Sequence, residues 1–162
     1  MGRRISNSIE KEEFIMELYD IAITSGDDEI VIGLEPAQKG FITAITVKLD
    51  TVDDNVSDKS ASMLAKIDIK GRMEEEITPQ LIKLYDWARE ESQAKCYRKL
   101  VIHIKDDSFK IRRTFEFENV FVVDYFEEYH SDGENDGENK KPSQFILSLT
   151  QKKNMLSSIK NY

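Results

Sequence analysis

The sequence predicts a mainly β protein with one helix, built as a small antiparallel β-barrel or sandwich. Three observations favour this class: five segments alternate apolar and polar residues, one segment near the middle has a helical pattern, and most connections are short and polar. Alternation with a period of two is typical of strands with one buried face. Several such strands joined by short connections favour a barrel or a sandwich.

The five alternating segments follow an ambiguous first one. Residues 14–23 read FIMELYDIAI and fit a helix and a strand about equally. The clear strands are predicted at residues 41–49, 64–70, 99–105, 109–118 and 144–150. Residues 120–123, VFVV, are apolar on both faces, so we expect that strand to continue into a place covered on both sides.

One helix is predicted from Thr78 to about Gln93. Thr78 can cap the helix, and Pro79 suits its first position. Apolar residues at helical spacing predict the face that packs on the core, which consists of Leu81, Leu84, Tyr85 and Ala88. Trp87 lies off the centre of this stripe, and we expect it at an exposed edge of the core.

Length and charge exclude several classes of protein. With 162 residues the chain is expected to form one domain. Lys and Arg number 23 and Asp and Glu number 31, so the net charge is −8 and a sequence-specific nucleic-acid binder is not expected. A single cysteine excludes an internal disulfide and a cysteine-ligated zinc, which fits synthesis in the cytoplasm.

Neither a signal peptide nor a membrane segment is expected. The positive start of the chain, residues 1–6, is followed by Glu10, Glu12 and Glu13 where a signal peptide would need an apolar run. No apolar stretch approaches the roughly 20 residues that a spanning helix requires.

Two polar connections are longer than the others. Residues 50–60, DTVDDNVSDKS, join two predicted strands, and residues 131–142 contain the tandem DGEN-DGEN. The second places Asp132, Glu134, Asp136 and Gly137 at positions 1, 3, 5 and 6 of an EF-hand-like loop. Position 12 is Ser143, where a bidentate Glu is required, so we expect a solvated acidic turn and no metal site.

Catalytic groups are not apparent. His103 and His130 are the only histidines and are expected at the surface, and no G-x-S-x-G, HExxH or glycine-rich phosphate loop occurs. Cys96 has Lys95 and Arg98 nearby, but the sequence indicates no histidine that could activate it. A thiol without a catalytic role is therefore the better interpretation. We expect no enzyme and no cofactor.

The order of the predicted elements resembles that of the tail-tube superfamily. This superfamily contains the haemolysin-coregulated protein (Hcp) of type VI secretion and the tube proteins of contractile phage tails and related injection particles. The resemblance is carried by residues 65–88 (AKIDIKGRMEEEITPQLIKLYDWA), 109–129 (FKIRRTFEFENVFVVDYFEEY) and 142–153 (PSQFILSLTQKK). It covers residues 14–153 and favours β structure for residues 14–21. It leaves residues 1–13 as a charged N-terminal extension and 154–162 as a C-terminal extension.

The resemblance implies a structural subunit that forms stacked, hexameric rings of an inner tube acting as a conduit for payload. Its implied partners are further copies of itself, sheath and baseplate proteins, and a payload or effector in the lumen. The implied location is a particle that is assembled in the cytoplasm and then released or injected.

The resemblance also implies a ring-stacking loop, which projects onto the adjacent ring. Its residues here are Asp50, Val52, Asp53, Asp54, Val56 and Asp58. Val52 and Val56 would be the apolar anchors of this loop, and a loop without such a contact remains the alternative.

Two other functions stay open. A baseplate or tube-initiator adaptor with the same fold would cap a tube without polymerising. A small β-barrel ligand-binding domain or enzyme would need a deep pocket with convergent polar groups, and the sequence offers no candidates for these.

Overall fold

The computed structural model describes residues 16–51, 63–131 and 141–162. Its strands are β1 (Leu18–Ser25), β2 (Asp28–Ile32), β3 (Ile42–Thr51), β4 (Met63–Arg72), β5 (Arg98–Lys105), β6 (Ile111–Glu128), β7 (Gln144–Gln151) and β8 (Lys160–Asn161). Its helices are α3 (Thr78–Ala88) and the short α4 (Gln93–Cys96), with 3-10 turns η1 (Pro36–Gln38), η3 (Glu75–Ile77) and η5 (Leu156–Ser158). The mainly β class, with one substantial helix among the described residues, is therefore confirmed.

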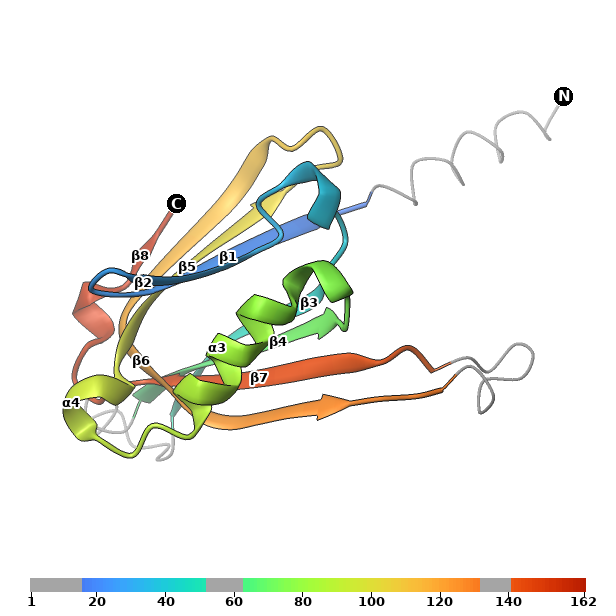
Figure 1. Cartoon of the computed structure of the whole chain (residues 1–162). Helices are drawn as coiled ribbons and strands as arrows, with labels where there is room; N and C mark the ends of the chain where they lie inside the picture. The colour runs from blue at the N-terminus through green and yellow to red at the C-terminus, as the bar shows by residue number, and fades with distance from the viewer. Residues whose placement is uncertain (1–15, 52–62, 132–140) are drawn as a thin grey trace, which may run out of the picture.

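All the strands belong to one antiparallel sheet in the order β2-β1-β5-β6-β7-β4-β3, and β8 pairs with β6. The sheet folds over itself into two layers, and β6 passes from one layer to the other (Figure 1). Its first half pairs with β5 from Ile111 to Val120, and its second half pairs with β7 from Val120 to Glu128. Of the two expected architectures, barrel or sandwich, the sheet does not close into a barrel, because among the described residues β2 and β3 end it without pairing to each other.

The core lies between the two layers and is built from the inward positions of the strands. Ile21, Ile67 and Ile102 are fully buried representatives of three different strands. In β4 the alternation is regular: Ala65, Ile67 and Ile69 are buried, whereas Lys66 and the other polar residues between them are exposed. This is the pattern of a strand with one face on the core.

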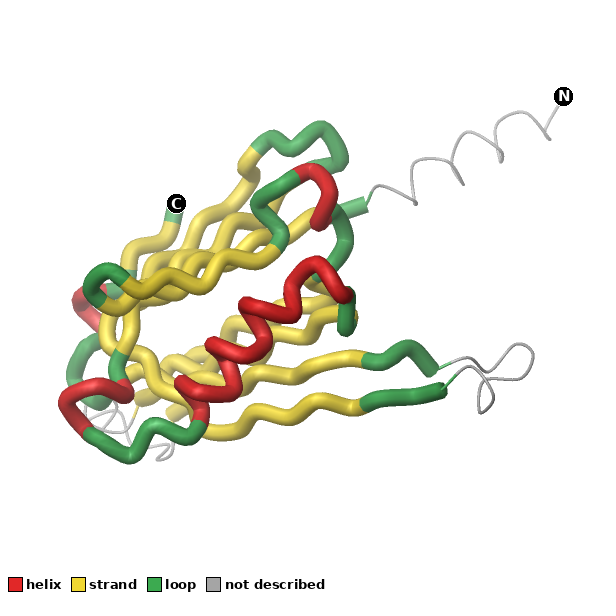
Figure 2. The backbone as a smooth tube through the Cα atoms, in the orientation of Figure 1, coloured by secondary structure: helices red, strands yellow, loops and turns green. Residues whose placement is uncertain are grey.

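Helix α3 covers the open side between the layers (Figure 2). Leu81 and Leu84 are buried, but Tyr85 is 56% exposed, so its predicted place on the core-facing stripe is wrong. Trp87 is buried instead, and its Nε1–H donates a 2.7 Å hydrogen bond to the carbonyl oxygen of Cys96. Ala88 is half-buried and ends the helix.

The helix boundaries also differ from the prediction. Ile77 is the N-cap residue and Thr78 is already helical, because the turn η3 leads directly into α3. The helix ends at Ala88, five residues before Gln93, where the separate α4 begins.

Strand structure is confirmed for the ambiguous first segment in its described part, since β1 begins at Leu18. The hairpin partner β2 was not predicted. Gly26 takes a φ of +58° in the turn between these two strands, a conformation that favours glycine. Residues 1–15 lie outside the described residues.

The stretch 120–123 is not covered on both sides as predicted. Val120 is buried, but Val123 is 53% exposed. The register between β6 and β7 shifts between Val122 and Asp124, and Asn119 just before has a φ of +53°. Val123 lies three residues after the buried Val120, so alternation alone places its side chain on the opposite face of the strand, away from the core.

The predicted C-terminal extension contributes to the fold. Thr114 and Tyr162 exchange two backbone hydrogen bonds of 2.6 and 3.0 Å, and β8 pairs with β6 beside them. Tyr162 Oη also donates a 2.8 Å hydrogen bond to Glu116 Oε2. The last residues therefore cover the edge of the first half of β6.

Candidate functional site

The two ends of the sheet differ in how their edge strands are covered. At the β2 end, the backbone N–H of Val31 donates a 3.0 Å hydrogen bond to Gln80 Oε1 of α3, and Lys83 Nζ donates a 3.1 Å bond to the carbonyl oxygen of Glu29. Lys83 Nζ also lies 3.2 Å from Asp28 Oδ1. The helix thus occupies polar backbone groups of the β2 edge.

The opposite end, β3, offers a long edge for pairing. Within the part of the chain that the structure describes, β3 pairs with β4 alone over residues 42–51. Thr43, Thr46, Lys48 and Leu49 are exposed, and Leu49 is exposed to 57%. A free strand of this length presents unpaired backbone groups to another strand.

An apolar groove runs beside this edge, between β3 and the C-terminal segment. It has a volume of about 280 Å³. Its apolar lining residues are Val47, Leu49, Met63, Phe115, Phe117, Leu156 and Ile159. Arg113 and Asn161 border it and share a 3.2 Å hydrogen bond. The groove thus lies between the edge strand β3 and the C-terminal segment that pairs with β6.

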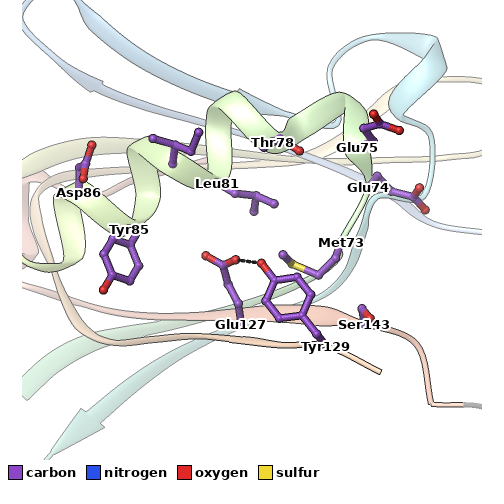
Figure 3. A pocket seen from close by; sticks show the side chains of 11 residues that line it. Met73, Glu74, Glu75, Thr78, Leu81, Tyr85, Asp86, Glu127, Tyr129 and Ser143 are labelled. Carbon is purple, nitrogen blue, oxygen red and sulfur yellow. Dashed lines mark hydrogen bonds between the residues drawn. The ribbon is translucent and has the colours of Figure 1, made fainter. Parts of the chain in front are cut away.

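A second groove lies between α3 and the β6–β7 hairpin (Figure 3). We call it the acidic groove; its volume is about 460 Å³, and it is lined by Met73, Glu74, Glu75, Thr78, Leu81, Ile82, Tyr85, Asp86, Glu127, Tyr129 and Ser143. Four of these side chains are carboxylates, and none is basic. The backbone N–H of Met73 donates a 3.1 Å bond to the Ser143 carbonyl oxygen, which joins the end of β4 to the start of β7 at the groove.

Hydrogen bonds fix the carboxylate on the sheet side of the acidic groove. Glu127 accepts a hydrogen bond from Tyr129 Oη (Figure 3). It accepts another from Tyr125 Oη at 2.8 Å. Burial and the bond to Glu127 raise the pKa of Tyr125, and the hydrogen bond to Glu127 raises the pKa of Tyr129. Both hydroxyls therefore stay protonated and donate their hydrogen bonds to Glu127.

The other three carboxylates come from the helix side. Glu74 pairs with Arg72, and Asp86 Oδ1 lies 2.9 Å from Arg89 Nη2. Glu75 and Glu127 form no ion pair among the described residues. The acidic groove can thus attract a cationic group, and its apolar and aromatic walls can contact an alkyl chain.

A buried charge cluster links β1 and β5. Asp20 is almost fully buried; its Oδ2 lies 2.5 Å from Lys105 Nζ, and its Oδ1 lies 2.8 Å from His103 Nδ1. Lys105 is also buried, so each charge compensates the other inside the sheet. His103 was expected to be an ordinary surface residue and is instead partly buried against Asp20. The alternation of β5 could not reveal this pairing, because Asp20 lies 83 residues away in the sequence.

Most residues of the predicted ring-stacking loop lie outside the described residues, namely Val52, Asp53, Asp54, Val56 and Asp58. Asp50 is described and belongs to β3, where its Oδ2 lies 2.9 Å from Lys66 Nζ. Asp132, Glu134, Asp136 and Gly137 of the DGEN tandem also lie outside the described residues. Within the described part of the chain, no group of acidic, histidine or cysteine side chains could hold a metal ion.

The remaining candidates show no catalytic arrangement in the described parts of the chain. Cys96 is half-buried, and its Sγ lies 3.5 Å from the Gln93 carbonyl oxygen. His130 Nε2 contacts Glu128 Oε1. The described helices are all too short or too polar to cross a membrane.

Comparison with known proteins finds solved structures that share the fold of this chain. No family model matches the sequence, and no curated protein sequence matches it either. Solved structures do match: the crystal structure of an Hcp protein has a TM-score of 0.56 at 12% identity, covering 83% of this chain and 86% of that one. The chain has the Hcp-like fold.

Two chains from an extracellular contractile injection system, PVC, share this Hcp-like fold. One comes from its sheath–tube complex, with a TM-score of 0.51 at 12% identity over 96% of both chains. The other comes from its sheath/tube terminator, with a TM-score of 0.52 at 11% identity over 90% of this chain and 93% of that one. The predicted resemblance to the tail-tube superfamily is therefore confirmed for the fold.

Proposed function

We propose that this chain is a structural subunit that forms stacked, hexameric rings of the inner tube of a contractile injection system or phage-like tail, with a payload conduit at the centre. The observation that carries the proposal is the uncovered edge of β3 in an Hcp-like fold. The ten residues of β3 pair with β4 on one side, and the exposed Leu49 lies near the end of the strand. A neighbouring copy can add a strand there and so continue the sheet around a ring.

Several features support this function. The edge at β2 is occupied by Gln80 and Lys83 of α3, so strand addition is directed to the other end of the sheet. Solved structures of similar fold come from a sheath–tube complex and a tube terminator. Sheath and baseplate proteins are therefore the proposed partners outside the ring, and the role requires no catalytic group.

Ring formation is tested by changing Leu49 to Asp. A charge at this exposed edge position should block pairing with a neighbour, and light scattering of the purified protein should show monomers in place of the rings formed by the unchanged chain. Leu34→Asp is the matched control, because Leu34 is 50% exposed but lies in the connection after β2. Association that survives Leu49→Asp, or an unchanged chain that stays monomeric at high concentration, would contradict the proposal.

A cap or initiator with the same fold is the second candidate, favoured by the similarity to a chain of the tube terminator structure. Such a protein would form rings without long stacks. Negative-stain electron microscopy distinguishes the two, since a tube subunit gives filaments of variable length and a cap gives single rings.

A further inference from the structure

The acidic groove has a basic counterpart at the opposite end of the same strand. Ser143, which lines the groove, immediately precedes β7, and Lys152 and Lys153 immediately follow it. Eight strand residues at about 3.4 Å each separate the two sites by roughly 27 Å. The two ends of β7 thus border different surfaces, an acidic groove at the start and lysine side chains after the end.

The basic counterpart consists of Lys95, Lys152 and Lys153, which we call the lysine cluster. All three side chains are exposed. Lys152 Nζ lies 5.3 Å from the centre of the Tyr97 ring, which directly follows α4 and its Lys95. Its backbone N–H donates a 2.8 Å bond to Asn119, which fixes the chain at this point. Lys95 and Lys153 form no ion pair with any described residue.

We propose that a second copy of this chain places its lysine cluster in the acidic groove, so that copies join head to tail. The proposal rests on the proposed tube function and names the surfaces through which one ring would contact the next. The groove and the lysine cluster are different surfaces, so the contact does not close on two copies and repeats along one direction.

The groove offers partners for both parts of a lysine side chain. Glu75 and Glu127 present carboxyl groups that form no ion pair with a described residue. Leu81, Tyr85 and Tyr129 provide apolar and aromatic surface for the alkyl stems and for an ammonium group above a ring. Each contact is weak by itself, but a ring repeats it once per subunit, so small contributions combine.

This contact is separate from the pairing at β3. Strand β3 runs antiparallel to β4, and β4 runs antiparallel to β7, so β3 and β7 end at the same end of the molecule. The groove borders the start of β7, at the other end. The lysine cluster follows β7 at the end where β3 also ends, so changes in the groove are the ones that disrupt stacking independently of the β3 edge.

Charge reversal on each side, followed by their combination, tests the proposal. Glu75→Lys and Lys153→Glu should each reduce the mean stack length at least about fivefold in electron micrographs at low salt, because attraction becomes repulsion. The chain that carries both changes should recover stacks within about twofold of the original length, since the reversed pair again carries opposite charges. Glu35→Lys, an exposed change outside the groove, is the control.

The outcomes separate this inference from the ring proposal. Rings that persist in the single variants while stacks shorten support both. The groove contact is overturned if the single changes leave the stack length unaltered, or if the double change shortens the stacks further. Neither result would contradict ring formation through β3. Stacks lost on Val52→Ser with Val56→Ser but unaffected by charge reversal would assign the contact to the segment after β3 instead. Unchanged protein that never stacks overturns the groove contact, and rings that persist in the Glu75→Lys variant show that misfolding does not explain a loss of stacks.

Discussion

Gln80 of α3 accepts a hydrogen bond through Oε1 from the backbone N–H of Val31, on the outer edge of β2, over 3.0 Å. The side chain of Gln80 thus accepts the hydrogen bond that a backbone carbonyl of a further strand would accept. The helix therefore closes one end of the sheet, and strand addition is possible only where no such cover exists.

Removing this cover should cost stability. Gln80→Ala leaves the N–H of Val31 without its protein acceptor, and we expect a loss of about 0.5–1 kcal/mol in the free energy of unfolding. Gln80→Glu keeps an acceptor at the same length and should lose less. Urea unfolding measures both variants, and an equal loss in the two would contradict the role of the hydrogen bond.

Trp87 should be among the most sensitive positions of α3. It is buried, and its indole N–H bonds to the carbonyl oxygen of Cys96, so Trp87→Ala should cost about 3–5 kcal/mol. Trp87→Phe retains most of the packing and should cost less. The surface control Tyr85→Ala should stay within about 0.5 kcal/mol in thermal or urea unfolding, because Tyr85 is exposed. A larger loss at Tyr85 than at Trp87 would refute this assignment of the helix faces.

Gly71 is required by close packing in β4. A Cβ at this position would lie 2.3 Å from Cε1 of Phe145 and 2.9 Å from the carbonyl oxygen of Phe41. Gly71→Ala should therefore destabilise the protein by about 1–3 kcal/mol. Adding Phe145→Leu should recover part of that loss, as a double-mutant cycle of unfolding free energies would show. Strictly additive losses would mean that the Cβ added at position 71 does not contact the ring of Phe145.

Acid should loosen the C-terminal strand. The hydrogen bond from Tyr162, together with the nearby charge of Lys99, holds the pKa of Glu116 below its ordinary value of 4.5. A carboxyl with a lowered pKa in the folded state stabilises that state above pH 4.5, and this contribution is lost as the pH falls through the lower, folded-state value. Hydrogen exchange at the Tyr162 amide, which bonds to Thr114, should lose protection over that interval. In Glu116→Gln, which cannot titrate there, protection should change less with pH.

The sequence was most informative for strands inside the sheet. In β4 the alternation of Ile67 and Ile69 with Lys66 and Asp68 matches burial residue by residue, because both neighbours of β4 are strands and one face meets the core. In β3 the same alternation predicted a buried Leu49, which is exposed, since the strand lies at the edge of the sheet. Periodicity indicates a face but does not indicate whether anything covers it.

The helix shows a similar limit. The predicted stripe ended in Tyr85 and Ala88, whereas the buried residues are Leu81, Leu84 and Trp87. The helix contacts both β2 and β6, so its buried face is set by two partners on different sides. A single stripe drawn from the sequence cannot represent both.

The acidic groove could not be predicted from the sequence at all. Its carboxylates, Glu74, Glu75, Asp86 and Glu127, come from the turn before α3, from α3 itself and from β6. Only the pairing of β6 with β7 and the packing of the helix bring them together. In a chain with a net charge of −8, such residues do not stand out individually.

The continuity of β6 has a mechanical consequence. Its 18 residues form part of both layers, so the covalent backbone itself ties one layer to the other. A load applied along this strand would act on its hydrogen bonds to β5 and β7 in shear, many at a time, instead of unzipping them singly. A chain built this way keeps its two layers joined while such a load acts along it.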